Sequence, residues 1–189
     1  MSLDRQLDAI VRATPSLMQV LETARDLDLP DGLIFSGAVY QRVLNQLTGR
    51  EPDYGIKDYD LGYFDGSDLF YEAEDRVIKR VAAAFEPPLR DKVEVRNQAR
   101  VHLWFEQRFG EPYTPLESTA AALSRFVSPM FAVGVWLAPD ESLRIVAPFG
   151  LEDIFDLRLR PNPLRPNSTG FARIAQATQA RWPEIRIEV

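Results

Sequence analysis

Two carboxylates separated by one residue lie in a stretch that otherwise favours a β-strand. The stretch covers residues 56–65, IKDYDLGYFD, and the paired acids are Asp58 and Asp60. Because strand side chains alternate between faces, both acids project to the same side, roughly 7 Å apart along the backbone. Two such charges repel each other unless a positive group lies between them. A divalent cation such as Mg²⁺ removes this repulsion, since it prefers oxygen ligands and commonly binds one or two carboxylates with substrate phosphates.

A third carboxylate has a similar setting. Glu94 stands between Val93 and Val95 in another short segment that is typical of a strand. If this strand pairs beside the first, all three acids can converge on one edge of the sheet, which favours a metal site. The alternative is that Asp58 and Asp60 line the solvent face of an edge strand.

Two neighbouring charged residues are not expected to belong to this group. Asp65 lies five residues after Asp60, points to the opposite face and precedes Gly66, so the Asp-Gly pair predicts the turn that ends the strand. Lys57 is adjacent to Asp58 and also points to the opposite face.

A strand-to-helix turn upstream has the residue types that bind phosphate. Residues 33–44 read LIFSGAVYQRVL, in which a short apolar strand is followed by Ser36, Gly37 and a helical pattern. Glycine lets the backbone approach a phosphate closely, and the helix N-terminus behind it offers free N–H groups. The Ser36 hydroxyl can donate a further hydrogen bond. The alternative is an ordinary tight turn, which is the commoner role of a Ser-Gly pair.

Hydrophobic periodicity predicts an alternation of helices and strands around these residues. Two N-terminal helices precede three strand–helix repeats, with Ser16 and Ser67 as expected N-caps. The last third contains a helix, a β-hairpin, two further helices separated by a proline-rich loop at residues 160–168, and a final strand. The predicted strands cover residues 33–38, 57–64, 92–96, 130–138, 142–147 and 184–189. The predicted helices cover residues 3–13, 16–29, 39–47, 70–84, 97–110, 114–127, 150–159 and 171–182.

This order predicts an α+β fold, in which a mixed β-sheet is flanked by helices and followed by a C-terminal β-hairpin and helices. We expect a single domain over residues 1–189, with a core at about residues 30–110 and a C-terminal extension at about 111–189. The sequence leaves open whether the extension forms a small lobe or wraps around the sheet.

The composition limits the class of protein. The chain has 189 residues, of which 46% are hydrophobic, and this is sufficient for a buried core. Its 22 Lys and Arg residues against 28 Asp and Glu residues give a net charge of −6, which disfavours non-specific binding to nucleic acid or to an anionic membrane. The chain has no cysteine, so disulfides and thiolate metal sites are excluded. No apolar run approaches the roughly 20 residues that span a bilayer, and we expect a cytoplasmic protein.

The histidine and the aromatic residues of the predicted helix 97–110 favour structural roles. His102 is the only histidine, which excludes a metal site with several histidines. We expect it to be a packed or capping residue, with a catalytic base as the alternative. Trp104, Phe105 and Phe109 have helical spacing and are expected in the core rather than as a platform on which bases stack.

Several arginines offer positive charge. Arg96 and Arg100 follow Glu94 closely and, with Asn97, have the groups to bind a phosphate or a nucleobase. Salt bridges are the commoner role for such arginines and are expected here. A basic cluster in the last third is expected to be solvated, with an anionic acceptor as the alternative ligand. Its members are Arg158, Arg160 and Arg165.

The candidate motifs, taken together, resemble those of a known superfamily. The Gly37-Ala38 turn, the Asp58-Tyr59-Asp60-Leu61 run and the Val93-Glu94-Val95 run are similar to the nucleotidyltransferase superfamily that includes DNA polymerase β. More closely, SGAVYQRVLNQLTG, KDYDLGYFD, VEVRNQARVHLWF, APFGLEDIF and LRPNP resemble a bacterial family of nucleotidyltransferase-like proteins. This resemblance covers about residues 30–185.

The resemblance implies a nucleotidyltransferase-like core with a two-metal site for phosphoryl transfer. Asp58 and Asp60 would hold Mg²⁺ or Mn²⁺ and orient the triphosphate of an NTP. Glu94 would help bind the second metal and activate the hydroxyl of an acceptor, which the resemblance does not identify. Ser36 and Gly37 would contact the nucleotide phosphates.

The sequence departs from the superfamily pattern in two places. The turn carries Gly37-Ala38 where Gly-Gly or Gly-Ser is usual, and the segment from Val39 to Lys57 is longer than the common spacing. The first departure motivates an alternative, a catalytically inactive module that binds nucleotide or another protein on the same fold. A hydrolase of small phosphorylated molecules is a third possibility.

Overall fold

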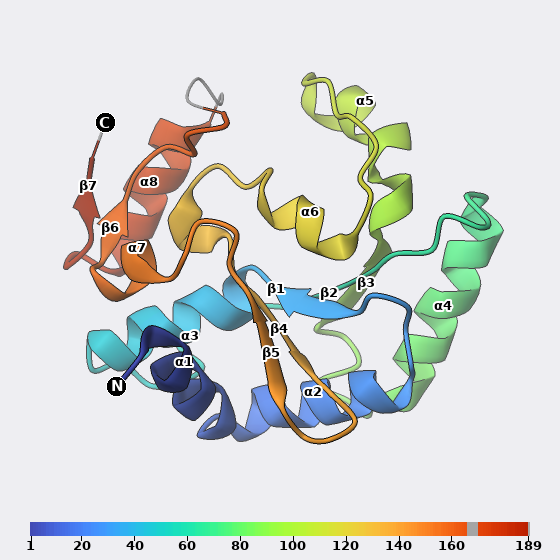
Figure 1. Ribbon diagram of the computed structural model, residues 1–189, viewed down its shortest axis with the longest axis horizontal. Helices are drawn as coiled ribbons and strands as arrows, with labels where there is room; N and C mark the ends of the chain where they lie inside the picture. Colours follow the sequence, from blue (N-terminus) through green and yellow to red (C-terminus); the bar gives the residue numbers. More distant parts are fainter. Residues whose placement is uncertain (166–169, 189) are drawn as a thin grey trace.

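The computed structural model describes residues 1–165 and 170–188. Its centre is a mixed five-stranded sheet in which one pair of strands is parallel and the other pairs are antiparallel (Figure 1). The strands are β1 (Leu33–Phe35), β2 (Tyr59–Tyr63), β3 (Val93–Asn97), β4 (Gly134–Leu137) and β5 (Leu143–Val146). Their order across the sheet is β3-β2-β1-β4-β5, and β2 and β3 are the parallel pair. This confirms the predicted α+β fold with a mixed sheet flanked by helices.

Four helices lie on one side of the sheet: α1 (Leu3–Arg12), α2 (Pro15–Asp26), α3 (Gly37–Leu47) and α4 (Tyr71–Ala84) (Figure 1). Their apolar stripes pack against the strand residues that face them, including Ile34, Leu61 and Val95, and this forms the main core. Strand residues alternate between faces, so the neighbours of these three residues, among them Asp60 and Glu94, point to the other side.

The other side of the sheet is covered by the segment that follows β3. It contains the 3₁₀-helices η1 (Gln98–Leu103) and η2 (Pro129–Phe131) and the short helices α5 (Phe105–Phe109) and α6 (Thr119–Leu123). A small second core fixes part of this segment onto the sheet. Its buried members are Leu33, Phe35, Leu123 and Ala132.

The C-terminal part joins the same architecture. The hairpin of β4 and β5 extends the sheet beyond β1, so the predicted hairpin is confirmed. Helices α7 (Glu152–Phe155) and α8 (Phe171–Arg181) follow, with a two-stranded parallel sheet of β6 (Arg158–Leu159) and β7 (Arg186–Ile187). Trp182 after α8 is fully buried, and its indole N–H donates a hydrogen bond to Asn45 Oδ1 on α3 at 2.9 Å. Residues 166–169 of the predicted proline-rich loop and residue 189 of the predicted final strand lie outside the described residues.

Two predicted helix starts differ from those in the structure. Helix α2 begins at Pro15 with Thr14 at its N-cap, since proline is well tolerated in the first turn of a helix. Helix α4 begins at Tyr71 with Phe70 at its N-cap position, and the predicted N-cap Ser67 instead donates from its N–H and hydroxyl to Asp65 Oδ1.

Three further predicted helices are shorter or divided. The helix predicted over residues 150–159 is limited to α7, because Arg158 and Leu159 form strand β6. The helix predicted over residues 97–110 is split, because Trp104 between η1 and α5 has a φ of −129°, outside the helical range. It ends at Gly110, as predicted, with a φ of 71°. Helix α6 ends at Leu123, where i→i−3 turns replace the helical pattern. Within residues 1–165 and 170–188, no helix is both long and apolar enough to cross a membrane.

Candidate active site

The pairing of three strands brings the predicted site residues together. Antiparallel pairing of β1 and β2 places Phe35 opposite Asp60, and parallel pairing of β2 and β3 places Asp60 opposite Glu94. Asp58 lies two residues before Asp60, immediately before β2 begins. The strands carrying Asp60 and Glu94 are therefore neighbours. The sequence alone predicts the convergence of these acids only on the condition that the two strands pair.

Asp60 is a largely buried carboxylate that lies close to the Asp58 carboxylate. Burial is the main cause that raises its pKa from the ordinary 3.8 to about 6, and the Asp58 carboxylate adds to this rise. A hydrogen bond from the Ser36 side chain opposes it, Glu94 raises the pKa further, and Arg96 lowers it. The net result is a carboxylate that would gain from a bound cation.

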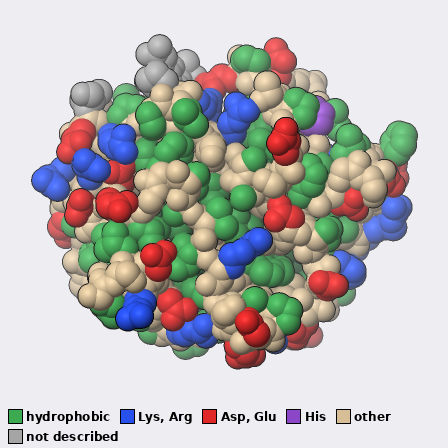
Figure 2. Space-filling model, in the orientation of Figure 1, with side chains coloured by type: hydrophobic (Ala, Val, Ile, Leu, Met, Phe, Trp, Pro, Cys, Tyr) green, Lys and Arg blue, Asp and Glu red, His purple; other side chains and the backbone are tan. Residues whose placement is uncertain are grey.

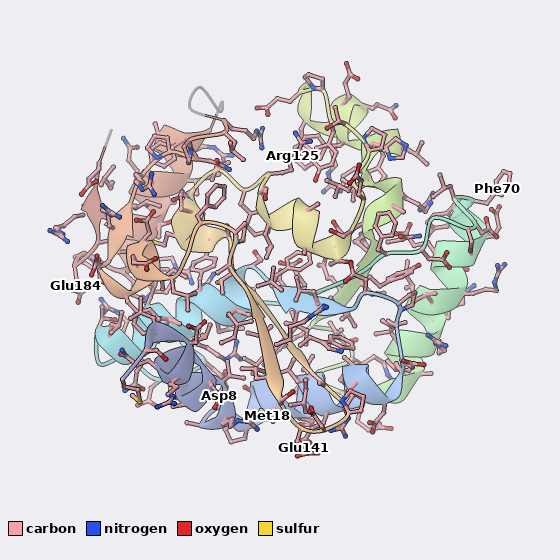
Figure 3. The ribbon with its side chains drawn as sticks, in the orientation of Figure 1. Asp8, Met18, Phe70, Arg125, Glu141 and Glu184 are labelled. Carbon is pink, nitrogen blue, oxygen red and sulfur yellow. The ribbon has the colours of Figure 1, made fainter. Side chains whose placement is uncertain are left out.

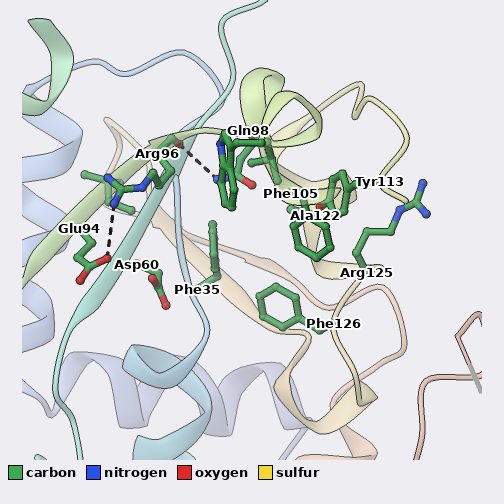
Figure 4. Close-up of a pocket in the computed structure, with 13 residues that line it drawn as sticks. Phe35, Asp60, Glu94, Arg96, Gln98, Phe105, Tyr113, Ala122, Arg125 and Phe126 are labelled. Carbon is green, nitrogen blue, oxygen red and sulfur yellow. Dashed lines mark hydrogen bonds and ion pairs between the residues drawn. The ribbon is translucent and has the colours of Figure 1, made fainter. Parts of the chain in front are cut away.

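Glu94 lies at the open side of this group. Its side chain is 56% exposed, and its carboxylate is 4.0 Å from Arg96 Nη2 (Figure 4). Arg96 also donates from Nη1 to the carbonyl oxygen of Val95 at 2.8 Å. The Arg96 cation is thus near Glu94, and its effect on the pKa of Asp60 is smaller than the effects of burial and of Asp58.

The Ser36-Gly37 turn connects β1 to α3 in a strained conformation. Ser36 has a φ of 63°, which is uncommon for a residue with a side chain and often occurs at functional sites. Its side chain forms no N-cap hydrogen bond to α3 and instead bonds to Asp60. At Gly37 an added Cβ would lie 2.7 Å from Gln41 Nε2, which is the end of a flexible side chain, so a side chain here would require Gln41 to move. The turn therefore lies against Asp60, at the N-terminus of a helix that continues to Leu47.

The structure adds a group that the sequence did not indicate. Arg181 at the end of α8 donates from Nη2 to Gln41 Oε1 and to the Gly55 carbonyl, both at 2.9 Å. Gln41 in turn donates to the Tyr40 hydroxyl at 3.2 Å. Burial raises the pKa of Tyr40, Arg181 opposes this rise, and Asp60 and Asp58 add to it. The Arg181 cation thus lies beside the turn. It is 140 positions from Gln41 in the sequence, and no local sequence pattern predicts a contact over such a separation.

A cavity of about 200 Å³ opens beside Asp60 and Glu94, between the sheet and the segment after β3 (Figure 4). Its wall includes Trp104 and Phe105, so the prediction that these residues lie in the core is wrong. Phe109, predicted with them, is 54% exposed. The two cores are filled by other residues, and Trp104 and Phe105 instead line the cavity on the side of the sheet opposite the main core.

Arg100 and the three arginines of the basic cluster in the last third form ion pairs with carboxylates. Arg100 forms a buried ion pair with Glu74, which confirms the expected salt bridge. The solvated cluster predicted in the last third is wrong in detail, because each of its arginines has a carboxylate partner. Arg158 and Arg160 both pair with Asp153, and Arg165 pairs with Glu111.

The outlying Asp65 and His102 lie apart from this group. Asp65 accepts hydrogen bonds from the hydroxyl and the N–H of Ser67, which lower its pKa and hold the turn after β2, as predicted. His102 is partly buried, and its Nδ1 has no hydrogen-bond partner among the described residues. It is not among the described residues that line the cavity beside Asp60.

The donor atoms of the site suit a hard cation. Asp58 and Asp60 supply carboxylate oxygens, and the pKa of Asp60 is raised mainly by burial and further by the Asp58 carboxylate. Among the described residues, no group of three or more His, Cys, Asp or Glu side chains is arranged to hold a metal ion. A cation bound by one or two carboxylates and by substrate phosphates is consistent with both observations. The predicted participation of Glu94 in metal binding stays a prediction.

Replacement of Asp60 by asparagine is expected to stabilise the metal-free protein at neutral pH. Since the pKa of Asp60 is higher in the folded state, folding favours its protonated form, and stability falls as the pH rises from about 4 to about 6. The difference between 3.8 and about 6 corresponds to at most about 3 kcal/mol. The free energy of unfolding of Asp60→Asn should therefore exceed that of the wild type by up to this amount at pH 8 and by little at pH 4. Urea unfolding in EDTA measures this difference.

Asp65→Asn is a matched control, for which we expect a change in stability of the opposite sign. The pKa of Asp65 is lowered by hydrogen bonds from Ser67, so its charged form is favoured in the folded state. The free energy of unfolding of Asp65→Asn should therefore be lower than that of the wild type at pH 8, and the difference should be smaller at pH 3. Equal pH profiles for Asp60→Asn and the wild type would contradict the assigned environment of Asp60.

Comparisons with known proteins show the family and the fold of the chain. A sequence model of the family described as Nucleotidyltransferase matches residues 22–187. A comparison with curated proteins finds no match. Among solved structures, the chain is similar to one described as an NMR structure that reveals a CCA-adding enzyme head domain. The two are 25% identical with a TM-score of 0.76, over 97% of this chain and 95% of that one.

Two solved complexes of CCA-adding enzyme share the fold. The complex with CTP is 17% identical with a TM-score of 0.58, and the complex with ATP is 16% identical with a TM-score of 0.55. Both matches cover 100% of this chain but only 44% and 43% of the enzyme chains. This chain therefore corresponds to less than half the length of those enzymes.

Proposed function

This chain belongs to a nucleotidyltransferase family, and on that premise we propose that it transfers a nucleoside monophosphate from an NTP to an acceptor hydroxyl with the help of Mg²⁺ or Mn²⁺. The observation that carries the proposal is the position of Asp60. It lies between neighbouring strands, with a pKa raised by burial and by Asp58, and it is hydrogen-bonded to the Ser36 turn. This combines a cation-binding carboxylate pair with a strand–helix turn of the kind that binds phosphate.

Each residue has a distinct part in the proposed reaction. Asp58 and Asp60 would hold a divalent ion, which would supply positive charge for the triphosphate and for the attacking and leaving oxygens. The acceptor oxygen forms a bond to the α-phosphorus while the bond to the β-phosphate oxygen breaks, and pyrophosphate leaves. Glu94, on the open side, takes the proton of the acceptor hydroxyl and would help to bind a second ion. Its exposure of 56% leaves room for an acceptor to approach.

The triphosphate is assigned to the side of the Ser36-Gly37 turn. Gly37 begins helix α3, whose N-terminus favours negative charge. Arg181 lies beside the turn through its hydrogen bond to Gln41 and supplies positive charge there. The shared fold with CCA-adding enzyme complexes that contain CTP and ATP supports an NTP as the substrate.

The proposal is tested by thermal unfolding in the presence of each NTP with Mg²⁺ or Mn²⁺. A ligand that binds only the native state stabilises it by RT ln(1 + [L]/Kd), so at 100 times Kd the gain is about 2.7 kcal/mol. For a chain of this length we expect the Tm to rise by about 5 to 10 °C. The nucleoside monophosphates and EDTA are the controls, and absence of a shift with every NTP in both metals would contradict the proposal.

A second candidate is a catalytically inactive module that binds nucleotide or another protein. It is favoured by two features of the turn: Ala38 lacks a hydroxyl, and the Ser36 side chain is hydrogen-bonded to Asp60. Incubation with α-labelled ATP separates the possibilities. Transfer incorporates the label into an acceptor, hydrolysis releases labelled nucleotide, and an inactive module leaves the ATP intact.

A further inference from the structure

Five aromatic side chains from the described part of the chain line the cavity beside Asp60 and Glu94. Phe35 and Phe126 form an edge-to-face pair with ring centroids 5.9 Å apart, and Phe105 and Tyr113 form a second pair at 4.4 Å (Figure 4). Trp104 also contributes to the wall. Phe105, Tyr113 and Trp104 lie outside both hydrophobic cores, so they are only partly buried by the protein itself.

The size and chemistry of this cavity suit one ring system. Its volume is about 200 Å³, and an apolar cavity of about 150 Å³ is sufficient to bind benzene. Aromatic side chains stack favourably on flat rings in offset or edge-to-face arrangements. Small-molecule sites are typically apolar with a few polar groups that fix orientation, and here Asp60 and Glu94 supply such groups at one end.

The arginines at the cavity already have partners within the protein. Arg96 lies near Glu94 and donates to the Val95 carbonyl. Arg125, which follows α6 (Figure 3), donates to the Thr114 hydroxyl and lies 5.7 Å from the centre of the Tyr113 ring. A polyanionic acceptor would need cations that are free to pair with its phosphates.

The charge of the molecule also disfavours a nucleic acid. The net charge is −6, and Figure 2 shows basic and acidic side chains interspersed over the face it displays. Proteins that bind nucleic acid without strong sequence preference instead present a positive groove.

The position of the cavity distinguishes the acceptor from the nucleotide. Among the described residues, the lining includes Asp60 and Glu94 but not Asp58, Ser36 or Gly37. The Ser36-Gly37 turn, to which the triphosphate is assigned, is therefore not part of the cavity wall, whereas Glu94, which would activate the acceptor hydroxyl, is.

We propose that this cavity binds the acceptor, and that the acceptor is a small molecule whose hydroxyl group is attached to a flat, largely apolar ring system. This inference rests on the proposed function, in which a nucleoside monophosphate is transferred to the hydroxyl of an acceptor. The ring stacks among Phe35, Phe105, Tyr113 and Phe126, and its hydroxyl points toward Glu94.

The experiment uses 2-naphthol as a probe of ring binding to the full chain, without metal or NTP. We expect saturable shifts of the Trp104 indole N–H signal in NMR spectra, assigned with Trp104→Phe. Ala122, at the wall of the cavity, is replaced by leucine to occupy it. Ala122→Leu should weaken binding at least about tenfold, because the larger side chain fills the space of the ring. Ala120→Leu on the same helix, outside the residues that line the cavity, should leave the affinity unchanged.

The wild type gives an independent measurement if Ala122→Leu fails to fold. Nuclear Overhauser contacts between the probe and the rings of Phe105 and Tyr113 are expected, and their absence at saturating probe would overturn the proposal. Equal affinity of Ala122→Leu and the wild type would overturn it as well.

Added nucleotide separates this proposal from the proposed function. ATP or CTP with Mg²⁺ should bind together with 2-naphthol. If a nucleotide displaces the probe competitively, the cavity holds the nucleobase and the proposal is wrong. If a single-stranded RNA oligonucleotide displaces it, a nucleic-acid acceptor is indicated, and the proposal is equally wrong. Probe binding without any NTP binding would support the ring site and count against nucleotidyl transfer.

Discussion

Replacement of both Asp58 and Asp60 by asparagine is expected to abolish metal-dependent NTP binding while the protein remains folded. Asparagine keeps the size of the side chain but removes both negative charges that would hold a divalent ion. Groups that merely hydrogen-bond to a metal ligand contribute about 10- to 100-fold to affinity, so the loss of two direct ligands should exceed about 100-fold. Isothermal titration of Mg·NTP measures the effect.

Stability provides the internal control for this variant. Since Asp60 is charged at an unfavourable buried position, its replacement should raise the unfolding free energy in EDTA, so that loss of binding cannot be attributed to loss of fold. Asp65→Asn with Asp68→Asn removes the same net charge from the loop after β2 and should bind Mg·NTP as the wild type does. If the Asp58 and Asp60 double variant also binds as the wild type, the site assignment is wrong.

Replacement of Glu74 by alanine is expected to lower the unfolding free energy by about 3 to 5 kcal/mol, because it leaves a buried charge without its partner. Glu74 on α4 is 4% exposed, forms an ion pair with Arg100 and accepts a hydrogen bond from the Asn97 N–H at 2.8 Å. Arg100 is 9% exposed and also donates to the Leu69 carbonyl at 2.9 Å. The pair therefore links α4, the end of β3 and η1, and it holds the strand that carries Glu94.

Urea unfolding at pH 7 measures this prediction against two further variants. Glu74→Gln retains an oxygen that can accept from Asn97, so its loss should be smaller than that of Glu74→Ala. Glu72→Ala changes an exposed carboxylate on the same helix and should shift the unfolding free energy by no more than about 0.5 kcal/mol. A Glu74→Ala variant as stable as Glu72→Ala would show that the buried ion pair does not stabilise this junction.

Local patterns in the sequence predicted most of the elements and the identity of the candidate carboxylates. The alternation of side chains in a strand placed Asp58 and Asp60 on one face, and the flanking valines of Glu94 identified its strand. The Ser36-Gly37 turn and the hairpin around Pro139-Asp140 were also predicted, because turn residues act over a few positions. The errors occurred where propensity is weak, as in residues 97–110, where Trp104 interrupts a helix that periodicity had favoured.

Long-range pairing decided what local patterns leave open. The tertiary structure places Asp60 between Phe35 and Glu94, turns the Ser36 side chain to Asp60, and brings Arg181 to Gln41 across 140 positions. It also removes Trp104 and Phe105 from the expected core and makes them the wall of a cavity. The sequence by itself thus determined which residues have the chemistry for a metal and a phosphate. Which of them meet, and what lies beside them, depends on strand order and packing between distant segments, and no repeating local spacing encodes these.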